Sequence, residues 1–347
     1  MSENGSGGAV LAAWRATDVT MGDVLAQLDG LRRAGQRSLA NRTSVVTLVV
    51  AASSEAEASA AVEVVHDFGG RHPARCVVVR AAPDESPAGI DARVSLLQGC
   101  SGDHPVWFED IRLTVRGGAA LHLAHLVEPL VLSDLPVAAW FPGRAPSPRH
   151  SLVAAADAVV MDSKYAIEDD GAQGDEPTVA ALPGTRDLAD VAALFGRQAV
   201  VDLAWIRLRP WRELLAALFD GSEYRPFAFG VRSAEVAGKA GARLLLGGWL
   251  SSRLGLASSR LHLLPARHAS LRLVAEHDGR TGTFVVERVQ GERLVRASAA
   301  IDGGPRHTEV LALPQADLSW SLAQGLAHLG RDQVYEDAVH AAVALSN

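Results

Sequence analysis

The sequence predicts an α/β domain with an open, mostly parallel sheet, followed by an α+β domain with an antiparallel meander and terminal helices. Apolar strands alternate with helical patterns up to about residue 221, and shorter, hairpin-spaced strands follow. The composition supports packed cores, because 48% of the 347 residues are hydrophobic and 21% are charged. We expect a flexible leader over 1–19, the α/β domain over 20–221 and the α+β domain over 222–347.

A βαβ unit opens the predicted α/β domain. An amphipathic pattern that begins at Thr20 predicts the first helix. The segment 44–52 is β-branched and apolar on both alternating faces, which is typical of a strand covered on both sides. A helix that ends at Phe68 and a strand at 75–80 complete the unit.

The same alternation continues through the rest of this domain. The expected elements are strands at 93–98 and 107–115, a helix at 119–132, strands at 136–141 and 157–161, and a helix at 210–220. Between residues 162 and 190, acidic residues outnumber basic ones eight to two. That balance is typical of a solvated loop, which we expect to lead into a helix.

The second domain has a different pattern of elements. The expected strands are 226–231, 261–264, 271–276, 284–289, 294–299 and 309–313, and the expected helices are 234–253, 318–329 and 332–344. Turn residues separate the strands, as in His277-Asp278-Gly279. Strands at hairpin spacing with helices kept apart from them predict an antiparallel meander.

Charge and cysteine content exclude several classes of protein. Lys and Arg number 33 against 40 Asp and Glu, a net charge of -7, which argues against a general nucleic-acid binder. Cys76 and Cys100 are the only cysteines, so we expect neither a disulfide framework nor a thiolate-rich metal site. The polar, Gly-rich start and the short apolar runs show neither a signal peptide nor a membrane span, which predicts a soluble cytoplasmic protein.

Catalytic and ligand motifs are sparse. No phosphate-binding loop or dinucleotide fingerprint is present, and no cofactor is implied. His122, His125 and Glu128 have the spacing of metal ligands on one helix face, but we favour a structural role for them. A possible ligand site lies where a buried strand ends, because ligands bind at the carboxyl ends of strands in open α/β sheets. Its residues are Asp162, Ser163 and Lys164.

Tryptophans fall in two compact stretches, 135–143 and 202–220, and the second also gathers arginines. Pro210 suits the first turn of a helix, where its missing N–H donor is harmless. Two interpretations stay open: a core helix with arginines extended along its edge, or a protein interface, where Trp and Arg are the residues most enriched. Under the second interpretation the residues expected to contact a partner are Trp140, Phe141, Pro142, Asp202, Trp205, Arg207, Trp211 and Arg212.

Several motifs occur in a characteristic order along the chain. They are His72-Pro73-Ala74-Arg75, Leu135-Pro136-Val137 with Trp140 and Pro142, Asp202-Leu203-Ala204-Trp205 with Arg207, Pro210-Trp211-Arg212, and Gly248-Trp249-Leu250 with Ser252-Arg253-Leu254. With them the chain, over about residues 20–345, resembles the glucose-6-phosphate dehydrogenase assembly protein family, also called OpcA.

The resemblance implies a non-enzymatic partner of glucose-6-phosphate dehydrogenase, the entry step of the pentose phosphate pathway in cyanobacteria and actinobacteria. It further implies that the protein helps the dehydrogenase to oligomerise and activates it allosterically. The main alternative is an α/β enzyme or sensor for a sugar phosphate or nucleotide at Asp162, Ser163 and Lys164. A third hypothesis is a scaffold without effect on catalysis. Some cyanobacterial members connect the enzyme to thioredoxin through cysteines, of which this chain has only two.

Overall fold

The computed structural model describes residues 9–35, 44–68, 74–101, 104–143, 145–164 and 185–345. The chain forms two compact units, neither of which is continuous in sequence. Unit 1 comprises Met1–Met161, Arg197–Val201 and Asp317–Arg331, and unit 2 comprises Asp162–Gly196, Asp202–Ala316 and Asp332–Asn347. The chain therefore changes unit several times, whereas the sequence analysis placed one boundary near residue 221. Most of the acidic segment 162–190 lies outside the described residues.

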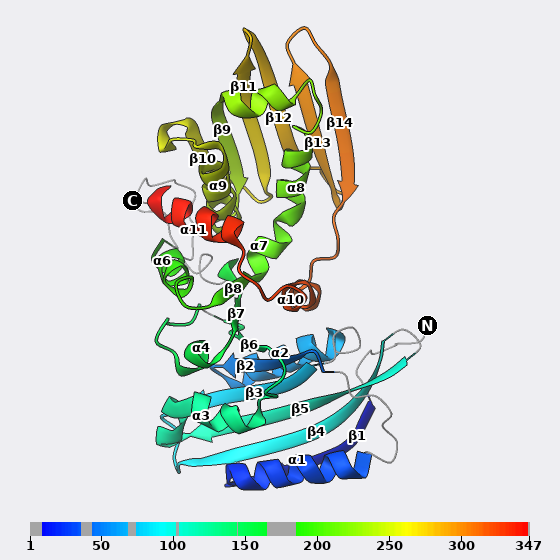
Figure 1. Cartoon of the computed structure of the whole chain (residues 1–347), viewed down its shortest axis with the longest axis vertical. Coiled ribbons are helices and arrows are strands. Elements are labelled where there is room, and N and C mark those ends of the chain that lie inside the picture. The colour runs from blue at the N-terminus through cyan, green and yellow to red at the C-terminus, as the bar shows by residue number, and fades with distance from the viewer. Residues whose placement is uncertain are drawn as a thin grey trace. The chain divides into compact units, whose positions relative to one another are not determined.

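An eight-stranded sheet organises unit 1, in the order β1-β4-β5-β3-β2-β6-β7-β8 (Figure 1). Its strands are β1 Ala9–Ala16, β2 Val46–Ala52, β3 Ala74–Ala82, β4 Gly89–Ser101, β5 His104–Arg116, β6 Val137–Trp140, β7 Ala158–Met161 and β8 Ala199–Asp202. The strands from β5 through β3, β2 and β6 to β7 pair in parallel, and β4 pairs antiparallel with both β1 and β5. This confirms the predicted α/β architecture with a mostly parallel sheet.

The helices of unit 1 follow the sequence patterns less closely. They are α1 Met21–Gly35, α2 Glu55–Phe68, α3 Leu123–Val127 between the 3-10 helices η1 Gly117–His122 and η2 Glu128–Leu130, α4 Ser151–Ala155 and α10 Leu318–Leu326. The single helix expected at 119–132 is broken into three short pieces, and Pro129 opens the last of them. Proline has no backbone N–H to donate, so it disfavours a continuous helix through this point. Residues 9–16, expected within a flexible leader, pair with β4 instead.

Apolar residues and one ionic cluster fill the interior of unit 1. In β2 and β3, the side chains of Leu48, Val50, Val77 and Val79 are at most 1% exposed. Both strands are covered on both faces, which explains why their sequences are continuous apolar runs. Beside them the Glu109 carboxylate accepts from Arg75 Nε at 2.8 Å and Arg32 Nε at 2.7 Å. Burial opposes ionisation of Glu109, but the two guanidinium groups outweigh it and lower the pKa of the carboxyl.

Unit 2 is built on a six-stranded sheet in the order β10-β9-β11-β12-β13-β14 (Figure 1). Its strands are β9 Val231–Gly238, β10 Leu261–Pro265, β11 Ser270–His277, β12 Arg280–Arg288, β13 Leu294–Ile301 and β14 Arg306–Ala312. Its helices are α6 Thr185–Leu194, α7 Leu203–Arg207, α8 Arg209–Ala217, α9 Ala240–Leu254 and α11 Gln333–Leu345, with the 3-10 helices η3 Arg225–Gly230 and η4 Ser258–Arg260. All pairs are antiparallel except β9 with β10, so the predicted α+β fold with an antiparallel meander is confirmed. Of the two terminal helices expected with it, α11 lies in unit 2 and α10 lies in unit 1.

The β11–β12 hairpin shows how turn chemistry sets the register of this sheet. His277 pairs with Arg280, and the two residues between them, Asp278 and Gly279, have φ angles of 48° and 70°. Positive φ at both positions defines the tight turn that matches the twist of paired strands.

The start of β9 differs from the expectation. The sequence analysis placed a strand at 226–231 and a helix from Ala234, but η3 occupies the first segment and β9 runs to Gly238. The β9 residues alternate between buried and exposed, a two-residue period that the Ala-rich composition concealed. The helix α9 begins at Ala240 and packs on α11, where Gly248 faces the backbone oxygen of Ala338.

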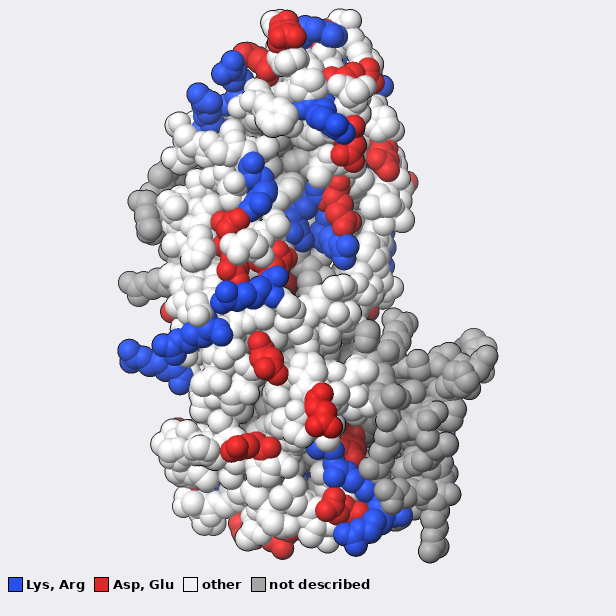
Figure 2. Space-filling view, in the orientation of Figure 1, with Lys and Arg blue, Asp and Glu red and all other residues white. Residues whose placement is uncertain are grey.

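The surface shows no large patch of one charge on the face in Figure 2, where Lys and Arg are interspersed with Asp and Glu. None of the helices described is both long enough and apolar enough to cross a bilayer.

Candidate functional site

The candidate site lies in unit 2, around the point where β8 ends and α7 begins. Asp202 is the N-cap residue of α7, and its Oδ1 atom accepts a hydrogen bond from the Ala204 backbone N–H at 2.9 Å. An aspartate suits this position because its carboxylate satisfies an N–H group that the first turn of a helix leaves without a partner. Local sequence therefore accounts for the helix start.

The Asp202 carboxylate also joins two other segments. Its Oδ1 atom accepts from the Ser163 backbone N–H at 3.0 Å, and its Oδ2 atom accepts from the Tyr335 hydroxyl at 2.8 Å. Asp202, Ser163 and Tyr335 are all at most 2% exposed. One buried side chain thus ties α7 to the 162–164 segment and to α11.

Burial sets the protonation of this pair. Desolvation raises the pKa of Asp202, and the neighbouring charge of Asp162 raises it further. Desolvation and the Asp202 charge raise the pKa of Tyr335 well above its ordinary value. The hydroxyl therefore stays protonated and donates a hydrogen bond to the carboxylate.

Trp205 is the centre of the second half of the cluster. Its indole Nε1 donates to Asp332 Oδ2 at 2.9 Å, and the side chain is 3% exposed. The Arg212 guanidinium carbon lies 3.3 Å from the indole ring centroid, and Arg212 Nη2 donates to the Trp205 carbonyl at 3.1 Å. Desolvation lowers the pKa of Arg212 to about 10, which leaves the side chain charged at neutral pH.

Asp332 completes the connection to α11. Its Oδ1 atom accepts from the Tyr335 backbone N–H at 3.0 Å, while Oδ2 holds the indole of Trp205. The rings of Trp205 and Tyr335 pack with centroids 5.4 Å apart. Asp202, Asp332, Trp205 and Tyr335 therefore form a closed network, in which each of the two carboxylates bonds both to backbone and to an aromatic side chain.

The predicted ligand residues take part in the same cluster. Asp162 is 3% exposed, and its Oδ1 atom accepts from Arg207 Nη2 at 2.6 Å and from the Lys164 backbone N–H at 3.1 Å. The Ser163 side chain is buried, whereas Lys164 is exposed. Because Arg207 is engaged by Asp162, and Asp202 lies close by, the charge at this position disfavours a phosphate group.

Trp211 and its helix contact the sheet of unit 2. The half-buried indole Nε1 donates to the Ala269 carbonyl at 3.1 Å. Pro210 stands in the first turn of α8, as the sequence predicts. Outward from the sheet, Arg209 and Glu213 form an exposed ion pair at 2.6 Å.

The other predicted contact corner lies in unit 1. Trp140 on β6 is 0% exposed and Phe141 is 6% exposed, where its ring packs edge-on against His150 with centroids 5.1 Å apart. Burial assigns both aromatic residues to the core, because a side chain without accessible surface touches no partner. Half-buried Pro142 is the accessible member of this corner.

The remaining sequence candidates do not assemble into a described site. The His122 and His125 rings stack with centroids 6.5 Å apart, but the described residues contain no group of three or more His, Cys, Asp or Glu that could hold a metal ion. Cys76 is buried, and burial raises the pKa of its thiol well above the ordinary value, which makes it unreactive. The side chain of Cys100 lies outside what the structure describes.

Asp332 and Tyr335 are not among the site residues expected from the sequence. Asp332 precedes a helical pattern, so its capping role could have been read from the sequence. No local signal connects Tyr335 with Asp202, because the two residues are 133 positions apart.

Comparison with known proteins matches two consecutive parts of the chain. Residues 65–182 match the glucose-6-phosphate dehydrogenase subunit N-terminal domain, and residues 198–339 match the C-terminal domain of the same subunit. A cyanobacterial protein from Synechocystis, named "Putative OxPP cycle protein OpcA", is 25% identical over 191 residues, which cover 52% of this chain and 37% of that protein. The chain thus spans well under half the length of this relative. With both domain models matched in order, the chain belongs to the OpcA family of glucose-6-phosphate dehydrogenase subunits.

Proposed function

We propose that this protein is a non-catalytic assembly factor that binds glucose-6-phosphate dehydrogenase and activates it, in support of the oxidative pentose phosphate pathway. The observation that carries the proposal is the ordered match to both domains of a dehydrogenase subunit family, over residues 65–182 and 198–339. The name of the cyanobacterial relative supports the same pathway.

The proposed contact surface in unit 2 is formed by the accessible side chains of α7 and α8, which we call the α7–α8 surface. It comprises Arg207, Arg209, Trp211 and Arg212, with Asp202 and Trp205 beneath it as positioning residues. Stacking on Trp205 and the bond to its carbonyl hold the Arg212 guanidinium in place before any partner arrives. An ordered arginine loses less side-chain entropy on binding, and arginine and tryptophan are typical interface hot spots.

Activation places a thermodynamic requirement on this interface. A partner shifts a conformational or oligomeric equilibrium only by the difference between its affinities for the two forms. A preference of about a thousandfold for the active oligomer corresponds to about 4 kcal/mol. Contacts that exist only in the assembled dehydrogenase must therefore supply that difference.

The alternative, a sugar-phosphate or nucleotide site at the 162–164 segment, is less well supported. The Arg207 guanidinium is occupied by Asp162, and the buried carboxylate of Asp202 lies against the same segment. Equilibrium dialysis of the isolated protein with glucose 6-phosphate distinguishes the two hypotheses. A pure assembly factor binds none, and saturable binding would favour the alternative.

A matched pair of variants tests the α7–α8 surface. Arg209 and Arg232 each form an exposed ion pair in unit 2, and their side chains are 59% and 58% exposed. Arg209→Ala is expected to weaken binding to the dehydrogenase about fivefold or more, as measured by biolayer interferometry, while Arg232→Ala stays close to wild type. Equal affinities for both variants would remove this surface from the proposal, and failure of the wild-type protein to bind would overturn the function itself.

A further inference from the structure

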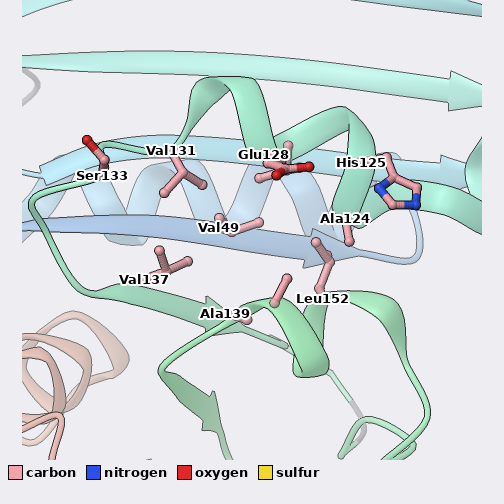
Figure 3. A pocket seen from close by; sticks show the side chains of 11 residues that line it. Val49, Ala124, His125, Glu128, Val131, Ser133, Val137, Ala139 and Leu152 are labelled. Atoms are coloured by element: carbon pink, nitrogen blue, oxygen red, sulfur yellow. The ribbon is translucent and has the colours of Figure 1, made fainter.

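Unit 1 has an apolar groove of about 510 Å³ between α3 and α4 (Figure 3). Val49 of β2 and Ala139 of β6 form its floor, and each is 1% exposed. Val127 and Leu152, from the two helical segments, contribute its walls. The short α3 and α4 do not cover the sheet completely here, and the volume lies within the range of protein binding pockets.

An exposed apolar side chain lies close along the chain to the groove. Leu121 in η1 is 68% exposed, and it precedes Ala124 and His125, two lining residues, by three and four positions. η1 ends at His122 and α3 begins at Leu123, so these residues do not share one continuous helix face. An exposed leucine this close along the chain to an apolar groove favours a protein segment over a small molecule as the occupant.

The charge at the edge of the groove indicates which charge the occupant carries. Glu128 is the only Asp, Glu, Lys or Arg among the lining residues, and it is exposed. In Figure 3 its carboxylate stands at the α3 side of the groove, on the same side as His125. An apolar floor with one acidic side chain at its edge complements an apolar side chain that has a cation beside it.

We propose that this groove receives an apolar side chain of glucose-6-phosphate dehydrogenase, with a neighbouring Lys or Arg of the enzyme paired to Glu128. The inference rests on the proposed function and adds a second contact to the α7–α8 surface. Unit 1 then supplies a pocket for an anchor residue, and unit 2 supplies ordered arginines.

Two adjacent alanines provide a matched test of the pocket. Ala154 and Ala155 are both exposed on α4, but only Ala155 lines the groove. Ala155→Phe fills the groove with its own ring and is expected to weaken the complex at least tenfold, because burial of one large apolar side chain is worth about that factor or more. Ala154→Phe is expected to stay within about twofold of wild type. Circular dichroism and the melting temperature confirm that both variants fold.

A second pair tests the charge. Glu128→Lys is expected to weaken binding about tenfold at low ionic strength and much less at 0.5 M salt, since salt screens an exposed ion pair. Glu63→Lys is the control, because Glu63 is exposed on α2 of the same unit and does not line the groove.

The outcomes separate this inference from the proposed function. Weaker binding by Ala155→Phe and Glu128→Lys, with both controls unchanged, supports the groove. If all four variants bind as wild type does, the groove assignment is overturned while the proposed function stands. If the wild-type protein forms no complex with the dehydrogenase, both fall.

Discussion

Replacing Asp202 by asparagine and by alanine separates the role of its hydrogen bonds from that of its charge. The carboxylate accepts from Ala204 N–H, Ser163 N–H and the Tyr335 hydroxyl. An asparagine carbonyl oxygen can accept both backbone bonds, and its NH₂ group can donate to the tyrosine oxygen. Asp202→Asn therefore preserves the network and removes a buried charge that stands beside Asp162.

The two substitutions are expected to differ by several kcal/mol. Asp202→Ala removes a helix N-cap, which costs about 1 kcal/mol, and leaves two buried donors without acceptors at about 1–3 kcal/mol each. Water that enters the space left by the carboxylate reduces the total, so we expect a loss of about 3–5 kcal/mol in the free energy of unfolding. Asp202→Asn should stay within about 1 kcal/mol of wild type at pH 7.

The pH dependence gives a sharper comparison. The pKa of Asp202 is raised in the folded protein above its ordinary value of 3.8. Below pH 3.8 the side chain is protonated in both states and does not lower the free energy of unfolding, whereas above the folded pKa its buried charge lowers that free energy most. The wild-type protein therefore loses this part of its stability as the pH rises from about 4, and the asparagine variant does not. Urea unfolding followed by circular dichroism, measured upward in steps from pH 4 to pH 8, should show the asparagine variant gaining stability relative to wild type as the pH rises. If Asp202→Asn is as unstable as Asp202→Ala throughout, the charge itself is required and this reasoning is refuted.

Two further predictions concern other parts of the fold. Glu109→Gln should destabilise unit 1 by about 3–5 kcal/mol, because Arg75 and Arg32 would face each other across a neutral side chain. The pKa of the Glu109 carboxyl is lowered in the folded protein, so wild type loses stability in acid as this group is protonated, and the variant should lack that loss. Acid and urea titrations check this, and an unchanged acid transition would contradict it. Gly248→Ala should lower the melting temperature by several degrees, because its Cβ would clash with the Ala338 backbone oxygen across the α9–α11 contact. Calorimetry measures the shift, and a variant as stable as wild type would show that the two helices can separate freely.

The parts of the fold that the sequence predicts are those with a local cause. The continuous apolar run of β2 and the Asp278-Gly279 turn each reflect chemistry within a few residues. The exceptions have competing local signals. Pro129 breaks an otherwise helical pattern, and β9 has an Ala-rich composition that suits a helix as well as a strand.

The candidate site is less accessible to sequence reasoning. Tryptophan and arginine enrichment singled out Trp205 and Arg212 as candidate contact residues, but it did not predict that the guanidinium stacks on the indole. Burial of this segment was one of the two interpretations that the sequence left open. The contact that decides it for Trp205 has no local signal, because Asp332, which accepts from the indole, lies 127 positions later, just before α11. Residues expected to form a surface thus include some that hold that surface from beneath.

The most direct test of the central claim is to measure the activity and the sedimentation coefficient of glucose-6-phosphate dehydrogenase from the same organism, with and without an equal concentration of this protein. Our account predicts higher activity together with a heavier complex, and a reduction of both effects by Arg209→Ala but not by Arg232→Ala. An unchanged activity and an unchanged sedimentation coefficient would contradict it.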